Sequence, residues 1–102
     1  MNEQELSERI EQGAELLDQE YPEWFSEIDE GRLDLRSHCS DVLAQLFGSY
    51  KDGLRFLEME YKEAQDHGLT ILNEDGDVPD IDEQYIALTR LWREAINKRL
   101  TA

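Results

Sequence analysis

Residues 2–21 read NEQELSERIEQGAELLDQEY, and their apolar side chains recur every three or four positions. This spacing places them on one face of an α-helix. The residues on that face are Leu6, Ile10, Ala14, Leu17 and Tyr21. Asn2 is suited to cap the helix, and the acids after it favour the positive end of the helix dipole. The stretch therefore predicts a helix that begins after Asn2 and ends before Pro22, because proline cannot continue it.

A short helix and an irregular connection are expected next. Residues 22–29 read PEWFSEID, and proline suits the first turn of a helix. The apolar side chains that this segment presents are Trp24, Phe25 and Ile28. Residues 29–37, DEGRLDLRS, are too short and isolated to form a sheet, and their alternation turns Leu33 and Leu35 inward.

The middle of the chain predicts two further helices. The first begins near Ser37 or His38 and ends at Gly48, a residue typical of the position after a helix. Its apolar stripe consists of Val42, Leu43, Leu46 and Phe47. Ser49 with Asp52 matches a capping box and opens a helix that stops near Gly68. The apolar side of this helix carries Tyr50, Leu54, Leu57, Tyr61 and Ala64. Gly53 within it indicates either close packing or a break.

The last helix is predicted to run from about residue 81 to residue 99. Its buried face would consist of Tyr85, Leu88, Trp92, Ala95 and Ile96. Lys98 and Arg99 lie where the helix dipole favours positive charge. Together the patterns predict an all-α protein, with residues 1–102 forming a single small domain of four to five short packed helices.

The charge of the chain is strongly acidic and unevenly distributed. Its 102 residues include 25 Asp and Glu against 10 Lys and Arg, for a net charge of −15. Residues 1–30 carry eleven acids against one arginine, whereas residues 84–102 carry four basic residues against one glutamate. Such a chain repels nucleic-acid phosphates, so we expect no direct nucleic-acid binding and an attraction to basic protein surfaces.

The composition also favours a cytoplasmic location. One cysteine cannot form an internal disulfide, which fits a reducing compartment. The first residues lack the basic start and apolar stretch of a secretory signal. No apolar run approaches the roughly 18–20 residues of a membrane span, so no membrane association is expected.

Several segments together resemble a known group of proteins. They are GAELLDQEYPEWFSEID, LDL, the pattern C-x-x-V-L-x-Q-L-x-G-x-Y-x-x-G-L and a C-terminal Y-x-A-L-T-x-x-W-R, within residues 13–93. In this combination the chain resembles a family of small uncharacterised proteins of actinobacteria and their phages. The resemblance implies a small bacterial or phage protein and supplies no activity. Members of that family often carry two nearby cysteines, whereas this chain has only Cys39, which puts any paired-cysteine chemistry in doubt here.

Residues 38–41, HCSD, contain the residue types of a hydrolase site. Neighbours on a helix point about 100° apart and cannot converge on one reacting atom. His38 and Asp41 can still touch at their three-residue spacing, which indicates a local contact at a helix start. Cys39 is expected to be a buried or partly buried structural residue, and His67 favours a helix C-terminus. We therefore predict no catalytic residues and no enzymatic activity.

The acidic segment 73–83, NEDGDVPDIDE, is the strongest candidate for a metal site. Matching it to an EF-hand loop places Ile71 at the first ligand position and Asp82, rather than Glu, at the last. A turn at Gly76 followed by capping of the last helix by Asp80 or Asp82 explains the segment better. No metal and no cofactor are predicted.

The first helix carries the best candidate for a binding surface. Its row of acids would lie opposite the apolar face, with no lysine beside it: Glu8, Glu11, Glu15 and Asp18. The neighbouring residues that could add a mixed acidic and apolar patch are Glu23, Trp24 and Glu27.

Two functions remain open. In the first, the acids imitate nucleic-acid phosphates on a basic partner surface, which would make the chain a phage or mobile-element accessory protein acting as an inhibitor or mimic. In the second, it is a small assembly module that homodimerises through apolar helix faces. A merely solvated acidic face and core positions for the two aromatics are the structural alternatives.

Overall fold

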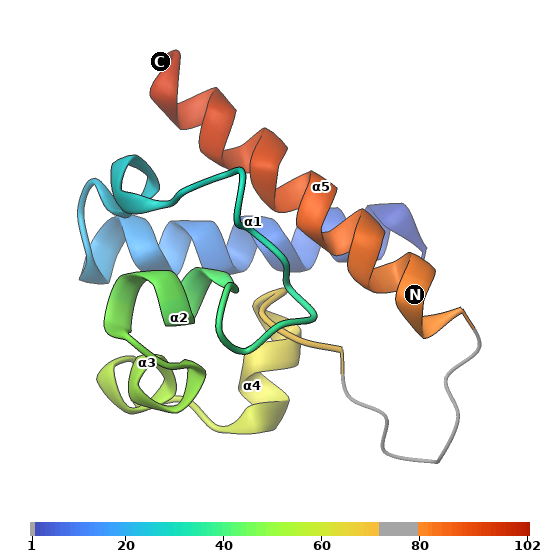
Figure 1. Cartoon of the computed structure of the whole chain (residues 1–102), viewed down its shortest axis with the longest axis horizontal. Helices are drawn as coiled ribbons and strands as arrows, with labels where there is room; N and C mark the ends of the chain where they lie inside the picture. Colours follow the sequence, from blue (N-terminus) through green and yellow to red (C-terminus); the bar gives the residue numbers. More distant parts are fainter. Residues whose placement is uncertain (1, 72–79) are drawn as a thin grey trace.

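The computed structural model describes residues 2–71 and 80–102, in which every regular element is a helix and no strand occurs. In chain order the elements are α1 (Glu3–Glu20), the 3-10 helix η1 (Trp24–Glu27), α2 (Val42–Phe47), α3 (Tyr50–Phe56), α4 (Tyr61–Asp66) and α5 (Ile81–Leu100) (Figure 1). The prediction of an all-α fold is confirmed. No helix in the described ranges combines the length and apolar character of a membrane span.

Helix α1 forms as its sequence predicts. The side chain of Asn2 caps it by accepting a hydrogen bond from the backbone N–H of Glu5, at 2.9 Å. Four of the five expected core residues are buried, namely Leu6, Ile10, Ala14 and Leu17. Tyr21, the fifth, ends the helix half-buried, and its N–H donates to the Leu17 carbonyl.

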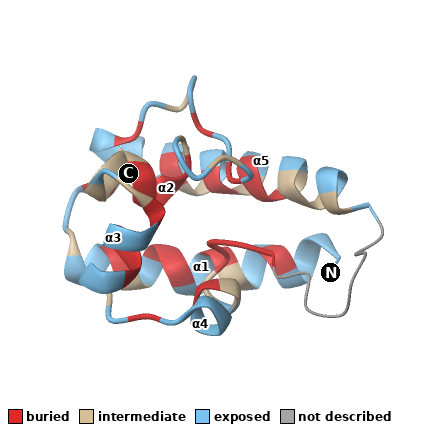
Figure 2. Cartoon of the chain, turned by 60° about the horizontal axis from the view of Figure 1, so that its bottom comes forward, coloured by how far each residue is buried: buried red, intermediate tan, exposed pale blue. Residues whose placement is uncertain are grey.

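Helix α5 crosses α1 and packs its apolar side against it (Figure 1). Buried residues of the two helices point into the molecule, whereas their outer sides are exposed (Figure 2). The buried face of α5 consists of Leu88, Thr89, Trp92 and Ile96, while Tyr85 and Ala95 of the predicted face are only partly covered. The ring of Trp92 meets Trp24 edge to face at a centroid distance of 5.7 Å, which joins η1 to this core.

At Gly13, helix α1 lies very close to the backbone at the end of α4. A Cβ atom at this position would overlap the His67 carbonyl oxygen at the end of α4. The indole Nε1 of Trp92 donates to the carbonyl of the next residue, Gly68, at 2.7 Å. Gly13 therefore allows α1, α4 and α5 to meet at one point.

Helix α2 begins later than the sequence analysis predicted. Its N-cap is Asp41, whose Oδ1 accepts from the Ala44 N–H at 2.7 Å, so the prediction of a cap at Ser37 or His38 is wrong. Residues 37–40 form turns instead, with the Ser40 N–H donating to the Ser37 carbonyl. An aspartate side chain directly before the apolar stripe supplies the acceptor that the helix start needs.

The predicted helix from Ser49 to Gly68 is two helices, so that prediction is wrong in its middle. Ser49 caps α3 through its Oγ, as expected, but Glu58 adopts φ +53° and separates α3 from α4. This break carries Met59 into the core and allows α4 to turn against α1. Gly53 marks close packing, because a Cβ there would lie 2.6 Å from that of Leu43.

The connections around these helices agree with their patterns in part. Leu33 and Leu35 are buried, as alternation predicts, and the Leu35 N–H donates to Thr89 Oγ1 at 3.0 Å. The predicted helix over residues 22–29 is shorter, a single 3-10 turn. Asp80 occupies the N-cap position of α5 with φ +59°, but its side chain makes no capping bond within the described residues.

Candidate functional site

Three of the four acids predicted to line α1 form one exposed surface. Glu8, Glu11 and Glu15 are exposed on the helix, and no ion pair to them occurs within residues 2–71 and 80–102. Among the described residues, Glu8 accepts a single long hydrogen bond, from Gln4 Nε2 at 3.5 Å. We call these three residues the acidic face.

Asp18 does not belong to the acidic face, because its carboxylate is bound within the protein. Arg99 of α5 donates to it in a bidentate pair, with Nε–Oδ1 at 3.0 Å and Nη2–Oδ2 at 2.8 Å. Trp24 Nε1 donates to Oδ1 at 2.9 Å. The hydrogen bonds from Arg99 hold the pKa of Asp18 below its usual value. Asp18 thus connects α1, η1 and α5, and its carboxylate is paired within the fold, unlike those of the other three predicted acids.

Trp24 is fully buried, with 0% of its surface exposed, so the prediction that it adds an apolar patch to the surface is wrong. Its ring packs edge to face against Phe25 at 5.9 Å, and the Arg99 guanidinium lies 5.7 Å from its centroid. The alternative of a core position for this tryptophan is confirmed. Burial of its large ring beside an internal hydrogen-bond acceptor explains the position.

The remaining two predicted residues flank η1 at the surface. Glu23 is exposed and adopts φ +66°, and its carbonyl accepts from the Ser26 hydroxyl at 2.7 Å. Glu27 is exposed and hydrogen-bonds the Tyr21 hydroxyl, which raises the pKa of Tyr21. Their carboxylates lie in this turn and do not form a mixed patch with Trp24.

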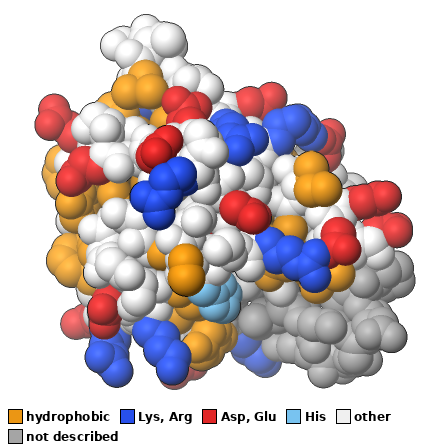
Figure 3. Space-filling view, viewed as in Figure 1, with side chains coloured by type: hydrophobic (Ala, Val, Ile, Leu, Met, Phe, Trp, Pro, Cys, Tyr) orange, Lys and Arg blue, Asp and Glu red, His pale blue; other side chains and the backbone are white. Residues whose placement is uncertain are grey.

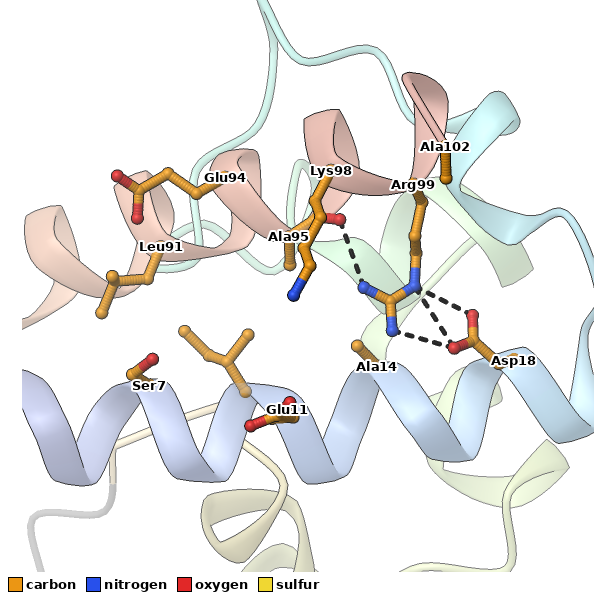
Figure 4. Close-up of a pocket in the computed structure, with 11 residues that line it drawn as sticks. Ser7, Glu11, Ala14, Asp18, Leu91, Glu94, Ala95, Lys98, Arg99 and Ala102 are labelled. Carbon is orange, nitrogen blue, oxygen red and sulfur yellow. Dashed lines mark hydrogen bonds and ion pairs between the residues drawn. The ribbon is translucent and has the colours of Figure 1, made fainter.

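A groove of about 440 Å³ separates α1 from α5 (Figure 4). Its apolar lining comes from both helices and comprises Ile10, Ala14, Leu91, Ala95 and Ala102. Glu11, Glu94 and Lys98 add charge, and Lys98 points from α5 toward α1 (Figure 4). Arg90 pairs with Glu3 across the two helices, and the Arg99–Asp18 pair joins them farther along.

Basic side chains of α5 therefore lie beside the acids of α1, which the sequence analysis did not predict. The hydrogen bonds that Arg99 donates to Asp18 raise the pKa of Arg99, and the negative charges of Asp18, Glu15 and Glu11 raise it further. The face of the molecule seen in Figure 3 carries Lys and Arg interspersed with Asp and Glu. The sequence does contain an indication of this arrangement. Residues 1–30 and 84–102 have net charges of opposite sign, which favours contact between the two long amphipathic helices.

The HCSD segment makes structural contacts, but no hydrogen bond or ion pair joins His38 to Asp41 within the described residues. The His38 ring stacks on Tyr50 at a centroid distance of 4.5 Å. Asp41 is 1% exposed and caps α2 with one oxygen, while its Oδ2 has no hydrogen-bond partner within the described residues. Burial raises the pKa of Asp41 to about 6, against the opposing hydrogen bond from Ala44. Cys39 is exposed, so its predicted burial is wrong.

The other candidate ligands remain apart or undescribed. His67 is the C-cap of α4, as predicted, and its Nδ1 lies 2.7 Å from the Glu63 carbonyl oxygen of its own turn. No group of three or more His, Cys, Asp or Glu side chains that could hold a metal occurs in the part of the chain that the structure describes. The acidic segment 73–83 lies mainly outside the described residues.

Comparisons with protein-family models, curated proteins and solved structures found no match to this chain. The candidate site therefore rests on its own geometry: an acidic face on α1 beside a partly apolar groove.

Proposed function

We propose that this chain is a non-enzymatic, intracellular protein-binding protein whose acidic face engages a basic surface of its partner. The observation that carries the proposal is the exposure of Glu8, Glu11 and Glu15 on one side of α1 without an ion pair in the described residues. Like charges three and four residues apart destabilise a helix by about 0.2–0.5 kcal/mol per pair. A binding function explains why the helix carries this cost.

The partner in this proposal is a protein surface that ordinarily holds nucleic-acid phosphates. Carboxylates on a rigid helix give long-range attraction and a higher association rate toward such a surface. The net charge of −15 makes a direct nucleic-acid partner unfavourable. An inhibitor or mimic encoded by a phage or mobile element fits this chemistry, and the family resemblance motivates the phage setting.

A tagged form of the protein tests the proposal by capture of host proteins at increasing salt. Replacing Glu8, Glu11 and Glu15 with glutamine should reduce the capture of specific partners several-fold, and wild-type capture should fall as salt rises. The matched control replaces Glu60, Glu63 and Asp66 around α4 with their amides, since these acids are also exposed. Equal capture by the two triple variants, or capture insensitive to salt, would refute the proposal.

Homodimerisation through apolar helix faces is the second candidate function. It is favoured by the exposure of Ile86 and Leu100 on α5, at 69% and 49%, and of Phe56 on α3, at 51%. Sedimentation over a concentration series tests it, with Ile86→Glu as the disrupting variant. A monomer at all concentrations would exclude this function.

A further inference from the structure

The groove between α1 and α5 differs in chemistry from the exposed acidic face beside it. Ile10 and Ala14 are buried at its base, and Leu91 and Ala95 remain partly exposed along the α5 side. Small alanines on both helices allow a third backbone or a long side chain to approach closely. A groove with this lining suits the apolar anchors of an amphipathic helix.

The groove carries charges of both signs, and the adjoining acidic face of α1 is the part of its surroundings that favours a basic occupant. Two ion pairs, Arg90–Glu3 and Arg99–Asp18, join the helices. Among the groove's charged residues, Glu11 makes no ion pair within the described residues, and Glu94 is held only at 3.7 Å by Arg90 of its own helix. The carboxylate of Glu11 is therefore available to a positive group that enters between α1 and α5.

The protein already places one such group there. The side chain of Lys98 extends from α5 toward α1 in the close-up of the groove (Figure 4). It makes no ion pair within the described residues. A lysine stem can lie along apolar surface while its ammonium group stays near water and carboxylates. Lys98 thus shows the kind of side chain that the groove accepts.

We propose that the α1–α5 groove is the docking site for a basic amphipathic helix of the partner protein, and that Lys98 occupies its lysine position in the free protein. An apolar side chain of that helix packs on Leu91 and Ala95, and its Lys or Arg displaces Lys98 beside Glu11. This inference rests on the proposed function, because it names the part of the partner that the acidic face attracts.

Two synthetic helical peptides of equal positive charge test the inference. One combines lysine, leucine and alanine on an amphipathic pattern, and the other has its leucines replaced by serine. The leucine peptide should bind about tenfold tighter, as burial of one leucine side chain implies. In NMR titrations its binding should shift the amide signals of Leu91 and Ala95 most.

Lys98→Ala is the decisive variant, because it vacates the groove without filling it. It should bind the leucine peptide several-fold tighter than wild type. Lys62→Ala changes the net charge equally on α4 and should have a much smaller effect. Ala95→Phe fills the groove and should reduce the leucine peptide to the affinity of the serine peptide.

The outcomes separate this inference from the function on which it rests. Equal binding of both peptides, or equal effects of Lys98→Ala and Lys62→Ala, would overturn the groove assignment. The proposed function would survive that result if replacement of Glu8, Glu11 and Glu15 with glutamine still weakened peptide binding. Absence of salt-dependent binding of either peptide would overturn both.

Discussion

Asp41 shows how one side chain can serve a helix and still weaken the fold at neutral pH. One carboxylate oxygen caps α2, whereas Oδ2 is buried without a hydrogen-bond partner in the described residues. Burial raises the pKa of Asp41 from 3.8 to about 6. The carboxyl group of Asp41 therefore binds a proton more tightly in the folded state than in the unfolded state. Ionisation of Asp41 consequently opposes folding.

Asp41→Asn is expected to stabilise the protein at pH 7. Because the folded pKa is the higher one, stability from this group is greatest below about pH 4 and is lost as pH rises to about 6. A shift of this size corresponds to at most about 3 kcal/mol. Asparagine keeps the cap without the charge, so urea denaturation at pH 7 should show a gain of about 1–3 kcal/mol.

The control is Asp41→Ala, which also removes the charge but loses the cap. It should be about 1 kcal/mol less stable than the asparagine variant. Between pH 4 and pH 6, both variants should show a flatter stability profile than wild type. An asparagine variant less stable than wild type at pH 7 would contradict this account of Asp41.

Asp18 has the opposite pH dependence, because its pKa is lowered chiefly by the hydrogen bonds from Arg99. Its stabilisation is present above the unfolded pKa and is lost as pH falls through the lower folded value. Asp18→Asn should cost about 1 kcal/mol at pH 7, since solvent screens this partly exposed pair. Glu15→Gln is the matched control and should be neutral or slightly stabilising, because Glu15 makes no ion pair within the described residues. A cost of Asp18→Asn that persists in strong acid would argue against the ion pair as its cause.

At the scale of elements, the sequence predicted those helix ends that depend on neighbouring residues alone. Asn2 and Ser49 cap their helices because a side-chain acceptor lies beside the first free N–H groups. The break at Glu58 had no such local signal. The break carries Met59 into a core built from distant segments. Sequence periodicity gives no information on contacts between distant segments, so it could not predict the break.

The meeting of α1, α4 and α5 at Gly13 gives a test at this scale. Alanine would gain up to about 1 kcal/mol in helix propensity, but its Cβ would overlap the His67 carbonyl oxygen. Backbone must then shift, so Gly13→Ala should lower the unfolding free energy by about 1–3 kcal/mol. Gln12→Ala, on the exposed side of the same helix, should be neutral or slightly stabilising. A stabilising Gly13→Ala would mean that the helices can separate freely at this point.

At the scale of the whole molecule, the candidate site could be predicted only in part. The exposed acids of α1 follow from helical spacing, because an apolar face fixes the opposite side. The removal of Asp18 from that row depends on Arg99, which is 81 residues away in the chain. The sequence left both a surface and a core position open for Trp24, and only the packed structure shows its ring against Trp92 of α5.

The net charge of −15 lowers the stability of the folded state, because folding brings like charges closer together. With a radius of gyration of 12.6 Å, two like charges about 12 Å apart in water repel by about 0.3 kcal/mol. Fifteen uncompensated charges make on the order of a hundred such pairs, whereas each exposed ion pair returns at most about 1 kcal/mol. Repulsion therefore exceeds the gain from pairs such as Arg90–Glu3, and added salt should raise the melting temperature.

Replacing Glu8, Glu11 and Glu15 with glutamine tests how much the repulsion between these carboxylates lowers the stability of the fold. At low salt the triple variant should melt several degrees higher than wild type, because three repelling charges are removed from one helix. Its melting temperature should also respond less to added salt, as differential scanning calorimetry can measure. A triple variant that is less stable than wild type would show that these carboxylates stabilise the fold. A gain in stability together with weaker partner capture would instead indicate that the acidic face is retained for binding at the expense of stability.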